Sequence, residues 1–210
     1  MKLLKDILCK MAILIVVFSP WLLSASAERI DYCDFIPEMY AGWSSNVTLP
    51  KFDPELGTLR GVDLSCEMNL SQEIMIENEN PKSANFTIML SGVMTVGLPS
   101  SESLSISFNR STTGNLSQYD GVSDYSGSSG SKSITQIPTE PATRSIADID
   151  NFLAHASGES IVLPVVVDAS SQTRTSGRSN SGVFSLAGAK VCVSYSYDAN
   201  QEKVASNVDE

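Results

Sequence analysis

Few side chains in this sequence have the types and spacing that catalysis requires. His155 is the only histidine, so a zinc site built on several histidines is excluded, and a Ser-His-Asp triad would have to use it. Ser129 and Lys132 have Ser-x-x-Lys spacing but lack the companion motifs of that chemistry. Asp53 with Glu55 is a carboxylate pair of the kind that glycoside hydrolysis needs, yet nothing marks it as buried or opposed. We therefore expect a protein that is not an enzyme.

Calcium binding is favoured over catalysis for the remaining acidic residues. Asp148 and Asp150, beside Asn151, would offer hard oxygen ligands on a loop. Asp120 with Asp124 is the alternative set, and the pair Asp148 and Asp150 is also the second carboxylate pair considered for hydrolysis. Neither set matches an EF-hand loop. We predict no obligatory cofactor and a calcium site, if one exists, at Asp148 and Asp150.

Residues 1–27 have the pattern of a cleaved export signal. Lys2, Lys5 and Lys10 give a basic start, residues 11–18 are apolar, and a small-residue Ala-Ser-Ala site follows. The apolar run is short for a membrane span of about 30 Å and is followed by Pro20. We therefore predict a secreted or cell-surface protein with no membrane insertion after cleavage.

The mature chain would be strongly acidic. Removing the predicted signal lowers the 14 basic and 24 acidic residues to 11 and 23, a net charge of −12 on 183 residues. That length fits one domain with its own core. An acidic exterior argues against nucleic acid and anionic membranes as partners, because both are bound by basic patches.

Three cysteines remain after the signal: Cys33, Cys66 and Cys192. In an exported chain at least one disulfide is expected, and the odd count leaves one thiol free or paired with another chain. Cys33 with either Cys66 or Cys192 is the favoured pairing, because it would hold the weakly patterned N-terminal segment. Such a bond, if it closed a long loop, would add about 3 to 4 kcal/mol to the free energy of unfolding in the chain-entropy treatment.

Five Asn-x-Ser/Thr sequons predict a glycoprotein in a host that has the required machinery. Their number modestly exceeds chance for a chain so rich in serine and threonine. Asn69 lies on the water-facing side of its strand, as a glycan requires. The acceptors are Asn46, Asn69, Asn85, Asn109 and Asn115.

The elements that must position these residues are strands. Residues 53–57 form a turn in which Asp53 would bond the backbone that follows, with Phe52 closing the end of the core. From Val62 to Leu70, apolar and polar residues alternate, which indicates a strand with one buried face that includes Cys66. Residues 183–197 alternate in the same way and are expected to form the closing strand.

The other strands are less regular. Residues 85–96 shift parity at Ser91 and Gly92, which predicts a bulge or bend, and residues 104–108 have a serine-rich outer face. Residues 111–144 are predicted to be mostly a mobile loop, or a short edge strand plus loop. Pro164 places its strand at a sheet edge or at a bulge, and Gly188 is expected to divide the last strand. Residues 145–156 predict one or two helical turns.

The block LPKFDPELGTLRGVDL, with residues 52–54 and 56–59 in its Phe-Asp-Pro-x-Leu-Gly-Thr-Leu turn, resembles the opening of the choice-of-anchor E domain. The closing VCVSYSYD and the Asn-Phe-Leu at 151–153 add to the resemblance, which covers about residues 45–198. The resemblance implies an exported prokaryotic β-sandwich without a known activity. It also implies that the closing strand pairs antiparallel with the strand that starts at Thr58. The predicted fold is an all-β, antiparallel two-sheet sandwich, jelly-roll-like or Ig-like. The predicted divisions are a signal at 1–27, an N-terminal segment at 28–45, the domain at 46–198 and a disordered acidic tail at 199–210.

Two functions of different classes remain. The favoured one is a non-enzymatic surface protein with a structural or adhesion role, whose partners would be other cell-surface proteins or polysaccharide. The alternative is a calcium-assisted carbohydrate-binding module in which exposed Trp43, Tyr119 and Tyr125 stack on sugar rings. A glycoside hydrolase is the least favoured.

Overall fold

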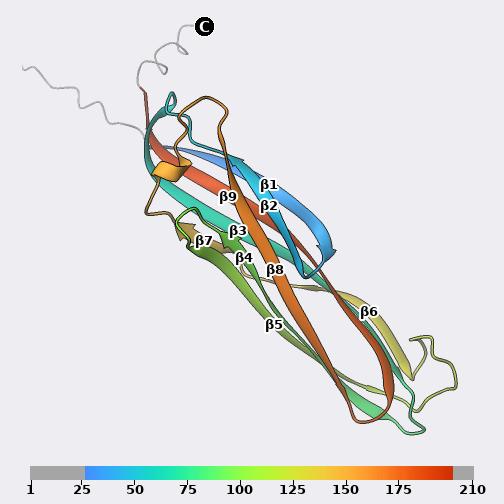
Figure 1. Cartoon of the computed structure of the whole chain (residues 1–210). Helices are drawn as coiled ribbons and strands as arrows, with labels where there is room; N and C mark the ends of the chain where they lie inside the picture. The colour runs from blue at the N-terminus through green and yellow to red at the C-terminus, as the bar shows by residue number, and fades with distance from the viewer. Residues whose placement is uncertain (1–26, 201–210) are drawn as a thin grey trace, which may run out of the picture.

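Two antiparallel sheets packed face to face make up the described chain, residues 27–200 of the computed structural model (Figure 1). The two-sheet sandwich predicted from the sequence is confirmed. The first sheet, sheet A, has the order β1-β9-β3-β6, and the short β7 also pairs with β3. Its strands are β1 (Ala27–Tyr40), β9 (Ser179–Ala199), β3 (Gly57–Asn78), β6 (Gly130–Ile137) and β7 (Ala142–Ser145).

The second sheet, sheet B, has the order β2-β8-β4-β5. One 3-10 turn, η1 (Asp150–Phe152), lies between β7 and β8, where one or two helical turns were predicted. Sheet B consists of β2 (Trp43–Pro50), β8 (Ser160–Thr175), β4 (Ala84–Gly97) and β5 (Ser103–Leu116).

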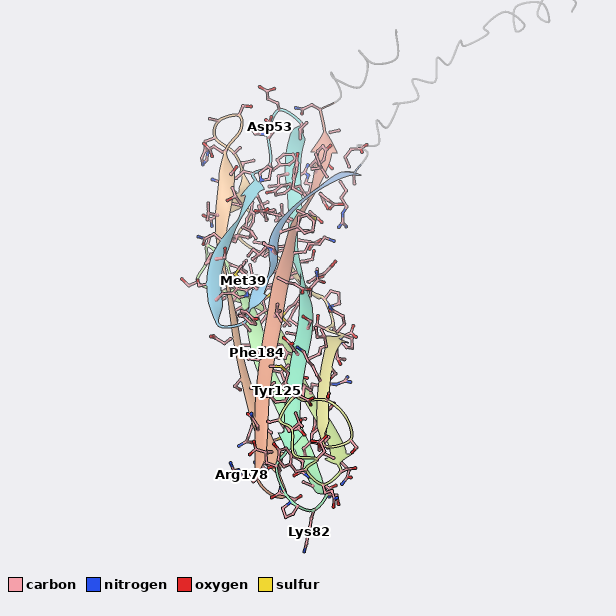
Figure 2. The ribbon with its side chains drawn as sticks, turned by 90° about the vertical axis from the view of Figure 1, so that its right-hand side faces the viewer. Met39, Asp53, Lys82, Tyr125, Arg178 and Phe184 are labelled. Atoms are coloured by element: carbon pink, nitrogen blue, oxygen red, sulfur yellow. A yellow bond between two sulfur atoms is a disulfide. The ribbon has the colours of Figure 1, made fainter. Side chains whose placement is uncertain are left out.

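The centre of sheet A is the long pair β3 and β9. The pair is antiparallel from Gly57 opposite Ala199 to Asn78 opposite Ser179, as the family resemblance implied. A strand of 22 residues is about 70 Å long at about 3.3 Å per residue, so the sandwich is elongated, with Asp53 near one end and Lys82 at the other (Figure 2). The alternating residues of both strands, such as Leu64 and Val193, are fully buried between the sheets.

The end of the core near Asp53 is closed by aromatic rings. Phe52 is buried, and its ring centroid lies 5.6 Å from that of Tyr195 and 5.1 Å from that of Tyr197. The predicted turn is confirmed, because Asp53 Oδ1 accepts the backbone N–H of Glu55 at 2.9 Å. Gly57 allows close strand approach there, since a Cβ would overlap the carbonyl of Asp198.

The predicted bulge or bend at Gly92 is wrong. β4 keeps one register with both β5 and β8, and its even-numbered residues face inward on both sides of Gly92. Gly92 occupies an inward position because the ring of Phe108 and the carbonyl of Asp168 fill the space where a Cβ would stand. The glycine accommodates a neighbouring ring, and the parity does not shift.

Two further predictions, one about the strand that contains Pro164 and one about a break at Gly188, are also wrong. β8 lies inside sheet B, between β2 and β4, and Pro164 is tolerated because pairing with β4 stops one residue away, at Val165. β9 runs without interruption through Gly188, where the backbone of β1 approaches so closely that a Cβ would stand 3.0 Å from the carbonyl oxygen of Ile36.

The low-complexity middle contains more strand than predicted. β5 extends to Leu116, β6 pairs with the far half of β3, and β7 pairs with residues 63–66. The connection at residues 117–129 has no strand. Strand pairing compensates for weak apolar content here, because an existing strand edge supplies backbone partners.

The sandwich starts earlier than the predicted boundary at residue 46. β1, within the predicted N-terminal segment, pairs with β9 from Ala27 opposite Asp198 to Tyr40 opposite Leu186. The predicted signal, apart from Ala27, and residues 201–210 of the predicted tail lie outside the described residues.

Candidate functional site

The predicted calcium ligands lie on an exposed loop. Asp148 and Asp150 are both exposed, and Asn151 donates its side-chain N–H to Asp148 Oδ2 at 3.1 Å. The alternative pair caps local turns: Asp120 accepts the N–H of Val122, and Asp124 accepts that of Ser126. Within residues 27–200, no group of three or more His, Cys, Asp or Glu side chains is placed to hold a metal.

The candidate catalytic groups are not brought together by the fold. His155 is exposed, and its backbone N–H donates to Glu159 Oε2 at 3.3 Å. This bond, with Lys51 nearby at 3.4 Å, lowers the pKa of Glu159. Ser129 is buried in the loop before β6, while Lys132 on β6 pairs with Glu73 at 3.4 Å.

Trp43 cannot stack on a sugar ring, so that expectation is wrong. Its side chain is 9% exposed, and its indole N–H donates to the carbonyl of Ala187 at 3.1 Å, between the sheets. Tyr119 and Tyr125 are half-buried in the 117–129 loop. The loop is held by Glu77, a fully buried carboxylate that accepts the N–H of Tyr125 at 2.8 Å.

The disulfide joins Cys33 to Cys192, one of the two pairings predicted. The residues are directly opposite on β1 and β9, with Cα atoms 4.1 Å apart, and Cys33 is exposed on the outer face of sheet A. Cys66 is free and buried on β3, as its parity predicted, and burial raises the pKa of its thiol to about 11.

All five sequon asparagines are exposed, and four of them share one face. Asn46 on β2, Asn85 on β4, and Asn109 and Asn115 on β5 have the parity of the outer face of sheet B. Asn85 and Asn115 are directly opposite, and the amide of Asn115 donates to Asn85 Oδ1 at 2.8 Å.

The outer face of sheet B is mostly polar on β5 and carries a few apolar side chains, such as Val162, on β8. Its β5 row consists entirely of serine, threonine and asparagine, and hydroxyls also meet across strands, as between Ser91 and Ser170 at 3.2 Å. The sequence showed the serine-rich start of this row but not its extension toward Leu116. The row comprises Ser103, Ser105, Ser107, Asn109, Ser111, Thr113 and Asn115.

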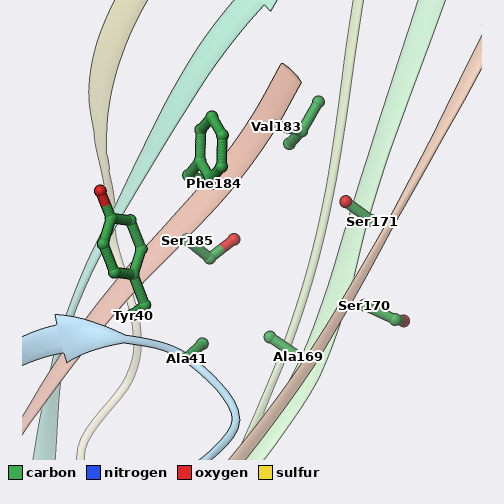
Figure 3. Close-up of a pocket in the computed structure, with 8 residues that line it drawn as sticks. All are labelled: Tyr40, Ala41, Ala169, Ser170, Ser171, Val183, Phe184 and Ser185. Carbon is green, nitrogen blue, oxygen red and sulfur yellow. The ribbon is translucent and has the colours of Figure 1, made fainter. Parts of the chain in front are cut away.

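Sequence reasoning missed a partly apolar groove at the side of the sandwich, where β1 ends and β2 begins. Figure 3 shows Tyr40 and Phe184 on one wall and Ala169 across from them. The groove has a volume of about 430 Å³, and the two aromatic rings make an edge contact at 5.9 Å. No pattern within a single strand reveals it, because it depends on where the neighbouring strands stop.

Comparisons with known proteins place this chain in no family. No family model matches it, and no curated protein matches it. Among solved structures, T=1 particles derived from infectious bursal virus align with 82% of this chain and 36% of theirs, at 11% identity and a TM-score of 0.17. A structure of the infectious bursal disease virus Gx strain aligns with 85% of this chain and 43% of its own, at 13% identity and a TM-score of 0.15. This chain thus spans less than half of the length of those chains.

The part of the chain at residues 27–200 contains no helix long and apolar enough to cross a membrane.

Proposed function

We propose that this protein is an exported β-sandwich with a structural or adhesion role at the cell surface or outside the cell, and that it is not an enzyme. The observation that carries the proposal is the outer face of sheet B. That face presents exposed hydroxyl and amide side chains over β2, β4 and β5, together with four sequons. A surface of this composition suits a hydrated, glycan-bearing exterior.

Two other features support the proposal. The Cys33–Cys192 bond lies on an exposed face, and such bonds persist in oxidising compartments. The elongated sandwich, whose central strands run its whole length, has the form of a spacer between a surface and a partner. The resemblance to the choice-of-anchor E domain, proposed from residues 52–59, is in keeping with both features.

Surface labelling in the native host tests the proposal. Intact cells are treated with a membrane-impermeant amine reagent, and tagged protein is recovered from cells and medium. Labelled protein is expected at the surface or in the medium, and a deletion strain is expected to attach less well to its usual surface. Protein that is protected from the reagent until the cells are lysed would contradict the proposal.

A further inference from the structure

A trough crosses the outer face of sheet B from strand to strand. Its floor is a row of short polar side chains, because Ser91 of β4 lies directly opposite Asn109 of β5 on one side and Ser170 of β8 on the other. The longer side chains of Met89 and Gln172, which also lie opposite each other, flank this row. The trough has a volume of about 480 Å³ and is lined by Met89, Ser91, Asn109, Ser170, Ser171 and Gln172.

The trough leads into the groove beside Tyr40. Ser170 and Ser171 line both hollows, so the two are continuous across the edge of β8. Figure 3 shows these two serines across the groove from Tyr40 and Phe184. Within the described chain, no charged side chain lines either hollow. Hydroxyl and amide groups that lead to an exposed aromatic ring suit a neutral saccharide, which both hydrogen-bonds and stacks.

One end of the trough is an attachment point for such a saccharide. Asn109 is the acceptor of a sequon that continues to Ser111, and its exposed side chain lines the trough. From Asn109 the row of short side chains reaches β8 after two strand spacings, about 10 Å. The next sequon asparagine on β5, Asn115, is about 20 Å further along the strand at about 3.3 Å per residue, and its amide donates to Asn85 Oδ1.

We propose that the glycan on Asn109 lies along the trough and covers the groove, where a sugar ring stacks on Tyr40. This inference rests on the proposed glycan-bearing exterior and adds that one glycan packs against the fold as a part of it. The Tyr40 side chain is 64% exposed, so its ring is free to be covered. Ser91 and Ser170 bond each other at 3.2 Å, and each hydroxyl keeps a further lone pair for a sugar hydroxyl.

The glycan covers two strand edges that have no neighbour within residues 27–200. Past the β1–β2 turn, residues 179–184 of β9 pair only with β3, and residues 168–175 of β8 pair only with β4. We call these two stretches the open edges, and Figure 1 shows β8 and β9 continuing well beyond the end of β1. Uncovered edges invite pairing with other chains, and native proteins cover or blunt them. None of the five sequons lies on β8 or β9, so a covering glycan has to reach these edges from a neighbouring strand.

Hydrogen–deuterium exchange on protein from a glycosylating host tests the proposal. Ser111→Ala removes the sequon of Asn109 but keeps the asparagine, and Ser117→Ala does the same for Asn115; both serines are exposed. Glycopeptide mass spectrometry establishes which asparagines carry glycans in each protein. Backbone amides of the open edges are expected to exchange about threefold or more slowly in wild-type and Ser117→Ala protein than in Ser111→Ala protein.

A second pair of variants separates attachment of the glycan from its packing. Tyr40→Ala keeps the Asn109 sequon, so the glycan should remain attached while the open edges lose their protection. Phe35→Ala is the matched control, because Phe35 lies on the same strand and is also 64% exposed. It should leave the protection unchanged. In protein produced without glycans, Tyr40→Ala should not alter exchange at the open edges.

The outcomes distinguish this inference from the proposed function. A glycan on Asn109 with equal exchange in wild-type and Ser111→Ala protein would overturn the inference and leave the glycan-bearing exterior intact. A bare Asn109 beside glycans at other sequons would do the same. Bare asparagines at every sequon would overturn both the inference and the glycan-bearing exterior.

Discussion

Replacing Cys33 with Ser removes the bond that ties β1 to β9 across 159 residues of chain. In the chain-entropy treatment, releasing a loop of this length lowers the free energy of unfolding by about 5 kcal/mol at 25 °C. The bond lies on an exposed face, so the substitution leaves no core cavity and the loop term dominates. Against a typical stability of about 5 to 15 kcal/mol, this loss is large.

Trp43 makes the assay direct. It is the only tryptophan after the predicted signal, and it is buried between the sheets. Urea unfolding followed by its fluorescence, with a slope of about 2 kcal/mol per molar urea, should show a midpoint lower by about 2.5 M. The experiment uses non-reducing buffer so that the wild-type bond stays intact.

A double-mutant cycle separates the bond from its residues. Cys192→Ser should lower the free energy of unfolding by the same amount as Cys33→Ser. The double variant should lower it no further than either single variant, because all three lose the same bond. A single-variant loss below about 1 kcal/mol, or a double variant that costs the sum of the singles, would refute the chain-entropy reasoning.

The remaining predictions concern packing, the free thiol, calcium and glycans. Gly92→Ala should lower stability by about 1 to 3 kcal/mol, because its Cβ meets the Phe108 ring, whereas Gly61→Ala, whose nearest neighbour is 4.0 Å away, should stay within about 0.5 kcal/mol in the same urea assay. Cys66 should react with a disulfide reagent at pH 8 far more slowly in folded than in urea-unfolded protein, because burial raises its pKa to about 11; equal rates would argue against the buried thiol. If calcium raises the melting temperature of wild-type protein, it should not raise that of an Asp148→Ala, Asp150→Ala variant; an unchanged response in the variant removes that site. Glycopeptide mass spectrometry of protein from a glycosylating host should find glycans at the sequons of the outer face of sheet B, and bare asparagines at all four would contradict the assignment.

The sequence predicted the central architecture because strand alternation is a local signal. Val62 to Leu70 and Val191 to Tyr197 alternate so clearly that their buried faces could be stated from parity alone, whereas their pairing was implied by the family resemblance. The turn at Asp53 was equally accessible, since it depends on a few adjacent residues. The position of Cys66 in the alternating pattern of its strand correctly predicted that its side chain is buried. The pattern left open whether Cys66 was a core side chain or part of a disulfide.

The predictions that failed concern residues whose surroundings are set by neighbouring strands, and the sequence does not identify those neighbours. Gly92 looked like a bulge because the ring that overlies it comes from β5. Pro164 looked like an edge residue because the end of β4 beside it is set by the β4–β5 turn. The aromatic type of Trp43 suggested a binding role, yet its burial is decided by β9. The groove at Tyr40 was missed for the same reason, since it depends on where β1 ends and β2 begins.

The most direct test of the central claim is peptide mapping, under non-reducing conditions, of the protein recovered from the outside of its native host. The account predicts a mature chain that begins at Glu28, with the peptides that contain Cys33 and Cys192 linked and Cys66 alkylated as a free thiol. An intact N-terminus at Met1 on protein confined to the cytosol, with all its thiols free, would contradict it.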